Sequence, residues 1–180
     1  KIQIPEIAAD FAVTQGRVSA IAMLHESLYK SNDLDRVHIK QILTDLVQQV
    51  ELAYGVNSNL IHFVVKVDDA KIDFDKAGPF ALIVNELVVN ALKHAFPGGN
   101  GGEIKLSTYA DDLNNKLNLE VSDDGVGFKG DIPKGKTSLG TTLVKRLADQ
   151  LSGELALQNQ SKGTSWILSF PCEQVESEDD

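Results

Sequence analysis

The chain has 180 residues, 42% of them hydrophobic, which is enough for one main domain with its own core. A formal net charge of −9 argues against the basic face of a duplex nucleic-acid binder, so we expect no nucleic-acid partner. No apolar run is long enough to span a membrane and no signal peptide opens the chain, so we expect no membrane contact from this segment. The single Cys172 excludes an internal disulfide and suits a reducing, cytoplasmic compartment, with Cys172 as a structural thiol near the last strand.

The first part of the chain, residues 4–29, carries apolar residues in a seven-residue repeat. This repeat predicts a long N-terminal helix packed in a coiled-coil-like bundle, whose partner helix the chain does not obviously supply. Because the chain starts at Lys1 rather than Met, in a segment that already looks helical, we expect a fragment of a longer protein. The seam positions are Ile4, Phe11, Val18 and His25, and Ile7, Thr14, Ile21 and Leu28.

After the break at residues 31–33, helix and strand patterns alternate. We expect helices from about residue 39 to Gly55, from about 78 to 96 and from 141 to 151. Residues 60–67 and 71–74 are expected to form a strand pair, residues 103–109 and 116–122 a second pair, and residues 154–158 and 164–170 a closing hairpin. The sequence thus predicts an α/β two-layer sandwich, with a mixed sheet covered by helices on one face and a long N-terminal helix before it.

This pattern implies three segments: residues 1–32 as part of a dimerisation helix, residues 33–172 as the main domain, and an acidic, frayed tail at 173–180.

The helix at residues 78–96 has an unusual polar face. Its polar residues Glu86, Asn90, Lys93 and His94 fall within an arc of roughly 100°, and apolar residues cover the opposite side. Solvent-facing positions favour flexible Lys and Glu over Asn and His, so this face indicates a binding site.

A second polar feature follows the strand at residues 116–122. Asp123 ends that strand, and Gly125 and Gly127 allow the backbone to turn tightly beside a ligand. A half-buried carboxylate at a strand end needs a hydrogen-bond donor, which a ligand can supply. A turn-capping role for Asp123 is the structural alternative.

Four segments together resemble the ATP-binding superfamily shared by DNA gyrase, the heat-shock chaperone, MutL and histidine kinases. They are NELVVNALKHA, DDGVGF, SLGTTLVKRL and KGTSW, in this order. The helix at residues 17–29 is also similar to the second dimerisation helix of one sensor histidine-kinase subfamily. The resemblance implies the Bergerat-type ATP-binding fold, with ATP and Mg²⁺ as cofactors.

The resemblance also implies roles for single residues. Asp123 matches the residue that reads adenine, and Thr164 the threonine that joins the adenine network, or else it is an ordinary strand threonine. Asn90 matches the magnesium-binding asparagine, whose carbonyl is a suitable hard-oxygen ligand; its alternative is a buried Asn that ties two loops together. Glu86 matches a general base in gyrase-like relatives, or supports Mg²⁺ through its bound waters.

Further phosphate contacts are expected around the same helix and the next one. Lys93 and His94 can reach phosphate oxygens, although a solvated lysine and a packed helix-end histidine are the alternatives. Backbone N–H groups at the start of the helix at 141–151 form a phosphate site. The residues there are Ser138, Leu139, Gly140 and Thr141, where the family usually has Gly-x-Gly. Residues 128–138 match the mobile lid over ATP.

The resemblance therefore predicts the ATP-binding domain of a two-component sensor histidine kinase. Such a kinase transfers the γ-phosphoryl group of ATP to a histidine and then to the aspartate of a response-regulator receiver domain, and works as a homodimer. His25 imitates an acceptor but occupies a seam position, so we expect the acceptor upstream of this chain. The alternatives are a histidine phosphotransferase or pseudokinase scaffold and a serine-kinase anti-sigma factor.

Overall fold

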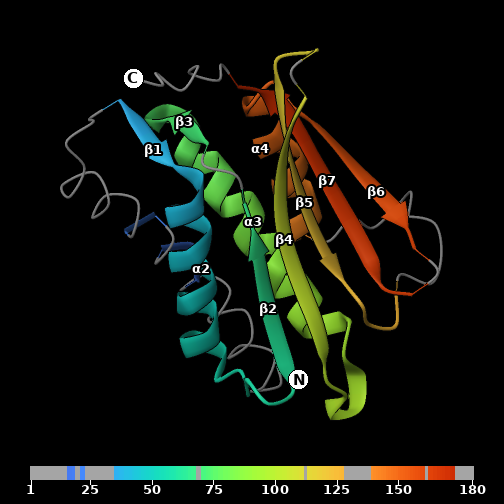
Figure 1. The fold of residues 1–180 in the computed structure, drawn as a ribbon. Helices are drawn as coiled ribbons and strands as arrows, with labels where there is room; N and C mark the ends of the chain where they lie inside the picture. Colours follow the sequence, from blue (N-terminus) through green and yellow to red (C-terminus); the bar gives the residue numbers. More distant parts are fainter. Residues whose placement is uncertain are drawn as a thin grey trace, which may run out of the picture.

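The computed structural model describes residues 16–18, 21–22, 35–67, 70–111, 113–127, 139–160 and 162–172. Residues 16–18 and 21–22 are helical. The elements that follow are shown in Figure 1. They are β1 (Arg36–His38), α2 (Ile39–Tyr54), β2 (Ile61–Lys66), β3 (Lys71–Asp73), α3 (Phe74–His94), the 3₁₀ helix η1 (Pro97–Gly99), β4 (Gly102–Asp111), β5 (Lys116–Asp123), α4 (Leu139–Gln150), β6 (Glu154–Asn159) and β7 (Thr164–Pro171).

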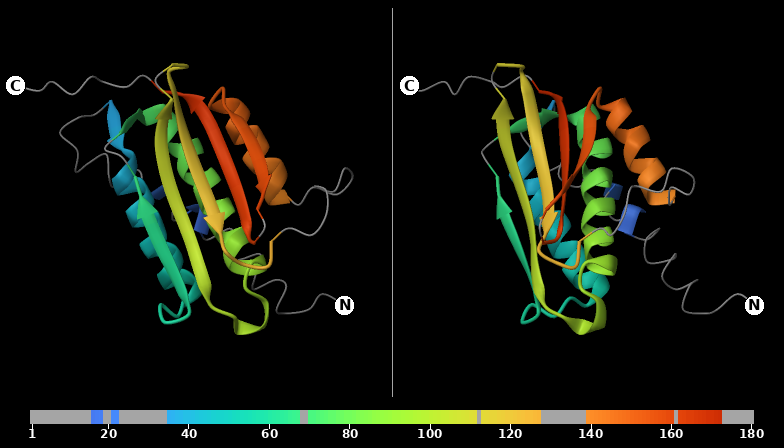
Figure 2. Two further views of the ribbon diagram at one scale, coloured as in Figure 1. Left: turned by 45° about the vertical axis from the view of Figure 1, so that its right-hand side comes forward. Right: turned by 90° about the vertical axis from the view of Figure 1, so that its right-hand side faces the viewer.

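The main sheet of the described residues has the strand order β2-β4-β5-β7-β6. β2 runs parallel to β4, and the other neighbours are antiparallel. Helices α2, α3 and α4 cover one face of this mixed sheet, as the edge-on view in Figure 2 shows. The two-layer α/β sandwich predicted from the sequence is therefore confirmed.

The core lies between α3 and the sheet. Phe80 of α3 and Phe170 of β7 have no exposed surface, and their ring centroids lie 5.8 Å apart. Alternating residues of β4 and β5 point into the same core because successive strand residues face opposite sides. They include Ile104, Leu106, Leu117 and Leu119, each at most 1% exposed. Cys172 follows β7 and is buried, as expected of a structural thiol.

The predicted strand pair at residues 60–67 and 71–74 is wrong. β2 joins the main sheet beside β4, and α3 lies in the connection between these two parallel strands. β3 instead pairs with β1, a strand the sequence did not predict, in a separate two-stranded sheet. Val37 of β1 lies opposite Ile72 of β3 and both are buried, so burial of a short apolar pair decides this pairing.

The helix predicted from about residue 78 begins earlier, at Phe74, and ends at His94. Gly78 and Pro79 both lie inside α3. Pro79 is the sixth residue of α3, beyond the first turn, so its missing N–H removes one hydrogen bond within the helix. Ala77 and Phe80 on either side have no exposed surface, and their burial outweighs the low helix propensity of the two residues between them.

Other expectations fall on residues that the structure does not describe. Of the seam residues, Val18 and Ile21 are described and are exposed. The remaining seam positions, His25 among them, lie outside the described residues, as do the lid at 128–138 and the acidic tail at 173–180. Among the described residues, no helix is both long and apolar enough to cross a membrane.

We predict that Phe80→Ala lowers the free energy of unfolding by about 3–5 kcal/mol, because it leaves a cavity where α3 meets β7. Chemical denaturation followed by circular dichroism measures this loss. Leu113→Ala is the matched control, since Leu113 is 96% exposed and its removal should change stability by no more than about 0.5 kcal/mol. Equal losses in the two variants would contradict the assignment of this core.

Candidate functional site

The polar face of α3 is present in the structure, and burial increases toward its N-terminal side. Glu86 is buried, with 4% of its surface exposed, and Asn90 is half-buried one turn later. Lys93 and His94 are exposed on the last turn. The four predicted residues therefore line one side of the helix, from a buried carboxylate to solvent-exposed cationic and imidazole groups.

The turn after β5 packs directly on the end of α3. The Val126 N–H donates to the Ala95 carbonyl at 2.9 Å. A Cβ at Gly125 would lie 2.2 Å from the same carbonyl oxygen, so only glycine permits this approach. Two segments that the sequence singled out separately thus meet at one place, with Ala95 between them.

Asp123 is a buried carboxylate at the centre of this junction, with 8% of its surface exposed. Its Oδ1 accepts a hydrogen bond from the Gly125 N–H at 3.0 Å. Removal from water raises the pKa of Asp123, against the opposing effect of hydrogen bonds from Gly125 and Thr164. A buried carboxylate held at this cost in a turn beside a helix end is a strong candidate for ligand recognition.

Thr164 lies directly opposite Asp123 in the β5–β7 ladder and hydrogen-bonds to its carboxylate. The preceding Gly163 has φ +81°, and a Cβ there would lie 1.7 Å from the Asp123 carbonyl oxygen. Gly127, at φ +72°, lies close to Gly163, and a Cβ there would be 3.0 Å from the Gly163 carbonyl oxygen. The predicted adenine-reading group of Asp123, Gly125, Gly127 and Thr164 is therefore brought together in space.

The neighbouring Asp124 has a different task. Its Oδ1 accepts from the Glu103 N–H at 2.7 Å, and its Oδ2 from the Lys162 ammonium at 3.1 Å. The Glu103 hydrogen bond, more than the Lys162 charge, lowers the pKa of Asp124. Asp124 fixes the start of β4 against the turn, a role that the sequence gave no signal to separate from that of Asp123.

The phosphate-binding residues are described only in part. Gly140 and Thr141 lie in the first turn of α4, and the backbone N–H groups of a helix's first turn point toward the helix start, where an anion can bind. Leu139 begins the helix, and Ser138 lies outside the described residues. α4 packs against α3, the helix that carries the polar face.

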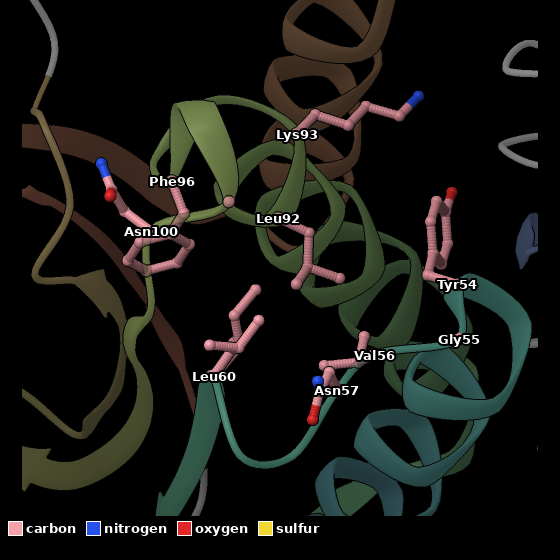
Figure 3. Close-up of a pocket in the computed structure, with 11 residues that line it drawn as sticks. Tyr54, Gly55, Val56, Asn57, Leu60, Leu92, Lys93, Phe96 and Asn100 are labelled. Atoms are coloured by element: carbon pink, nitrogen blue, oxygen red, sulfur yellow. The ribbon is translucent and has the colours of Figure 1, made fainter.

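A separate pocket of about 260 Å³ lies between α2, the start of β2 and the end of α3. Figure 3 shows Leu60, Leu92 and Phe96 turned toward one another, while the Lys93 ammonium group extends away from them. Asp123, Asn90 and Thr164 do not line this pocket, so it is distinct from the junction described above.

Sequence reasoning missed one partner of the site. Arg17 of the N-terminal helical segment donates from Nε to Glu86 Oε1 at 2.7 Å and from a terminal nitrogen to Oε2 at 3.0 Å. The Glu86 bond is the largest cause that raises the pKa of Arg17. Glu86 is therefore already engaged by a cation 69 positions away, and no sequence pattern could have paired the two.

The junction of an Asn-bearing helix with an Asp-x-Gly-x-Gly turn matches a known family. Residues 75–174 match the model of the histidine kinase-, DNA gyrase B- and HSP90-like ATPases. The chain belongs to this family of ATPases. Residues 1–54 additionally match a histidine kinase model, which covers the segment that carries Arg17. The family resemblance inferred from the sequence is thereby confirmed.

Histidine kinases are among the proteins that are similar to this chain. The chain is 29% identical over 160 residues to sensor histidine kinase PdtaS of Mycobacterium tuberculosis, covering 86% of this chain and 31% of that protein. It is 30% identical over 111 residues to blue-light-activated histidine kinase 2 of Erythrobacter litoralis, covering 61% of this chain and 32% of the relative. The chain thus spans about a third of these relatives.

A solved structure shares the fold. The blue-light-activated histidine kinase EL346 of Erythrobacter litoralis superposes with a TM-score of 0.76 at 25% identity, over 87% of this chain and 47% of that one. Its isolated histidine kinase domain gives a TM-score of 0.77 at 24% identity, over 89% of this chain and 75% of that one. The Bergerat-type fold expected from the sequence is confirmed.

Replacing Asp123 or Asp124 by Asn should change the free energy of unfolding in opposite directions, and each change should depend on pH. Because the folded-state pKa of Asp123 is raised, its ionisation costs stability, so Asp123→Asn should stabilise the protein at about pH 7. This gain should shrink as pH falls through the raised pKa toward about 3.9, the ordinary value. Because the pKa of Asp124 is lowered, Asp124→Asn should destabilise, by an amount that shrinks only below about pH 3.9.

Urea denaturation of both variants and the parent across this pH range measures the two differences. The paired design controls for position, since the residues are neighbours. If Asp123→Asn destabilises the protein at neutral pH, Asp123 is a structural residue that caps the turn. This result would contradict the interpretation that its carboxylate is buried in order to bind a ligand.

Proposed function

We propose that this chain binds ATP with Mg²⁺ and forms the catalytic part of a sensor histidine kinase. In the complete protein it would transfer the γ-phosphoryl group to a histidine, for relay to the aspartate of a response-regulator receiver domain. The observation that carries this proposal is the buried Asp123 carboxylate, held between Gly125 and Thr164 against the end of the Asn90 helix. The family membership and the sensor-kinase relatives support it.

Adenine recognition is assigned to the junction of β5 and α3. The Asp123 carboxylate accepts one hydrogen bond from Gly125 and retains acceptor capacity for an exocyclic amine. Thr164 stands beside it and completes the hydrogen-bond network. Gly125 and Gly127 keep the backbone close enough for a flat base to lie against the turn.

The phosphate end is assigned to the polar face of α3 and the first turn of α4. Asn90 offers one carbonyl oxygen to Mg²⁺, which leaves the rest of the octahedral shell to water and phosphate oxygens. Among the described residues no group of three or more His, Cys, Asp and Glu side chains gathers to hold a metal, so Asn90 and the nucleotide would share this task. Lys93, His94 and the N–H groups of residues 138–141 would contact phosphate oxygens.

Phosphoryl transfer at such a site depends on positioning and electrostatics rather than on covalent chemistry by the protein. Glu86 lies one turn before Asn90 and is the candidate for orienting or deprotonating the attacking group. In the structure both of its carboxylate oxygens accept hydrogen bonds from Arg17, which fixes the side chain in place.

The N-terminal segment is assigned to the dimerisation module, with residues 33–172 as the catalytic domain and 173–180 as an acidic tail. Val18 and Ile21 are 63% and 45% exposed and would contact a second copy through the seam. The histidine kinase match over residues 1–54 favours this assignment over a serine-kinase anti-sigma factor. We place the acceptor histidine upstream of the chain and the whole segment in the cytoplasm.

Asp123→Ala should weaken ATP and ADP alike, by about 1–3 kcal/mol, because both share the adenine amine that loses its buried acceptor. Isothermal titration calorimetry measures both affinities, and the parent should bind GTP poorly. Leu113→Ala serves as the control that leaves both affinities unchanged, since its side chain is exposed on the β4–β5 turn. Equal affinity of the parent for ATP and GTP would rule out this adenine assignment.

Asn90→Ala should remove the Mg²⁺-dependent part of ATP affinity and leave adenosine binding intact, because Asn90 is assigned to the ion and not to the base. Titrations of ATP with Mg²⁺ and with EDTA, and of adenosine, separate the two contributions. A variant that keeps the full response to Mg²⁺ would show that Asn90 only supports the loops around it.

A further inference from the structure

The described part of the N-terminal segment lies against α3, on the side away from the sheet. Figure 2 shows residues 16–18 and 21–22, in blue, beside this helix in the edge-on view. The ion pair of Arg17 with Glu86 joins the two elements, with N–O distances of 2.7 and 3.0 Å. Both Glu86 oxygens accept a hydrogen bond from Arg17, so the ion pair is bidentate, and this geometry fixes the orientation of the two side chains as well as their distance.

A second contact places the segment independently of this ion pair. A Cβ at Gly16 would lie 3.6 Å from both terminal atoms of Asn85, which is ordinary van der Waals contact. Asn85 is 3% exposed, and its amide nitrogen is buried without a hydrogen-bond partner among the described residues. The N-terminal segment therefore packs on the turn of α3 that carries Asn85 and Glu86.

The charge balance of this turn depends on Arg17. The Glu86 side chain is 5% exposed, whereas that of Arg17 is 22% exposed at the edge of the contact. Burial is the main cause that raises the pKa of Tyr54, at the end of α2, and the negative charge of Glu86 raises it further. Without Arg17, the described residues would leave Glu86 as a buried carboxylate with no ion-pair partner, one turn from Asn90, which is a costly arrangement.

We propose that Arg17 is a positioning residue of the nucleotide site: it docks the N-terminal helix on α3 and neutralises Glu86 beside the triphosphate. Asn90, Lys93 and His94 remain uncovered or only half-buried, so the docked segment leaves the phosphate end open. The position of the N-terminal helix then sets the charge next to the γ-phosphate. Val18 and Ile21 stay exposed on the same segment and remain free to contact a second copy.

This inference rests on the proposed nucleotide site for its effect on ATP, but docking itself is testable without nucleotide. Trypsin cleaves after Arg17 only when the Arg17 side chain separates from Glu86 and binds in the active site of the protease. Glu86→Gln should therefore speed cleavage at the Arg17–Val18 bond on the order of tenfold, because cleavage follows the open population when reclosing is fast. Mass spectrometry of the native, full chain over time measures the rate.

Two controls accompany this measurement. Glu120→Gln is the matched substitution, since Glu120 is a partly buried carboxylate that accepts from Ser165 in the sheet, away from Arg17. Cleavage after Arg36 in β1 reports general unfolding in every sample. If Glu86→Gln unfolds the chain, amide hydrogen exchange of residues 16–22 in Arg17→Gln replaces it, with faster exchange expected. No acceleration relative to the controls in a folded variant would overturn the docking.

The electrostatic effect is tested by calorimetry with ATP and ADP in the presence of Mg²⁺. Arg17→Gln should weaken ATP on the order of tenfold and ADP clearly less, because the γ-phosphate adds the charge that faces uncompensated Glu86. Arg17→Gln combined with Glu86→Gln should recover most of the loss, which a merely structural role for Arg17 would not allow. Arg36→Gln is the control, since Arg36 pairs with Asp73 on the small sheet.

Equal losses for ATP and ADP, or no recovery in the double variant, would overturn the electrostatic role of Arg17. Failure of the parent to bind either nucleotide would instead contradict the proposed function and leave the protease result to decide the docking. The two failures are therefore distinguishable.

Discussion

The contact between the turn after β5 and the last residues of α3 is the constraint on which the site depends. The Val126 N–H bonds to the Ala95 carbonyl, and Gly125 approaches that carbonyl more closely than any side chain would allow. The sheet and the helix layer are thereby fixed relative to each other at one end of α3. Asp123 on a strand and Asn90 on a helix can serve one ligand only because this contact sets their relative position.

The proposed site contains two buried carboxylates, and the fold treats them differently. Asp123 has only neutral hydrogen-bond donors among its described partners, and its burial raises its pKa. Glu86 faces the guanidinium of Arg17. A carboxylate without a counter-charge is costly to fold but keeps acceptor capacity for a ligand, whereas a paired one is held in place. The first arrangement suits recognition of a base, and the second suits control of charge near phosphates.

The difference between local patterns and tertiary contacts explains which parts of the fold were predicted correctly from the sequence and which were not. Periodicity located α2, α4 and the strands β4 to β7 because each buries one regular face. It misjudged residues 60–74, since a strand pattern shows that a segment is extended but not which neighbour it pairs with. The start of α3 was placed late because Gly78 and Pro79 act as local breakers, while the burial of Ala77 and Phe80 acts through tertiary contacts.

The sequence by itself determined the identities and order of the residues proposed to bind the ligand, because Asn90, Asp123 and the glycines beside it are unusual choices for their positions. It also indicated the family, since that order is specific. The tertiary structure alone decided which groups meet. Thr164 stands beside Asp123 through strand pairing, and Arg17 reaches Glu86 through helix docking. Such contacts join residues far apart in the chain, so their energy depends on distances that no local pattern contains.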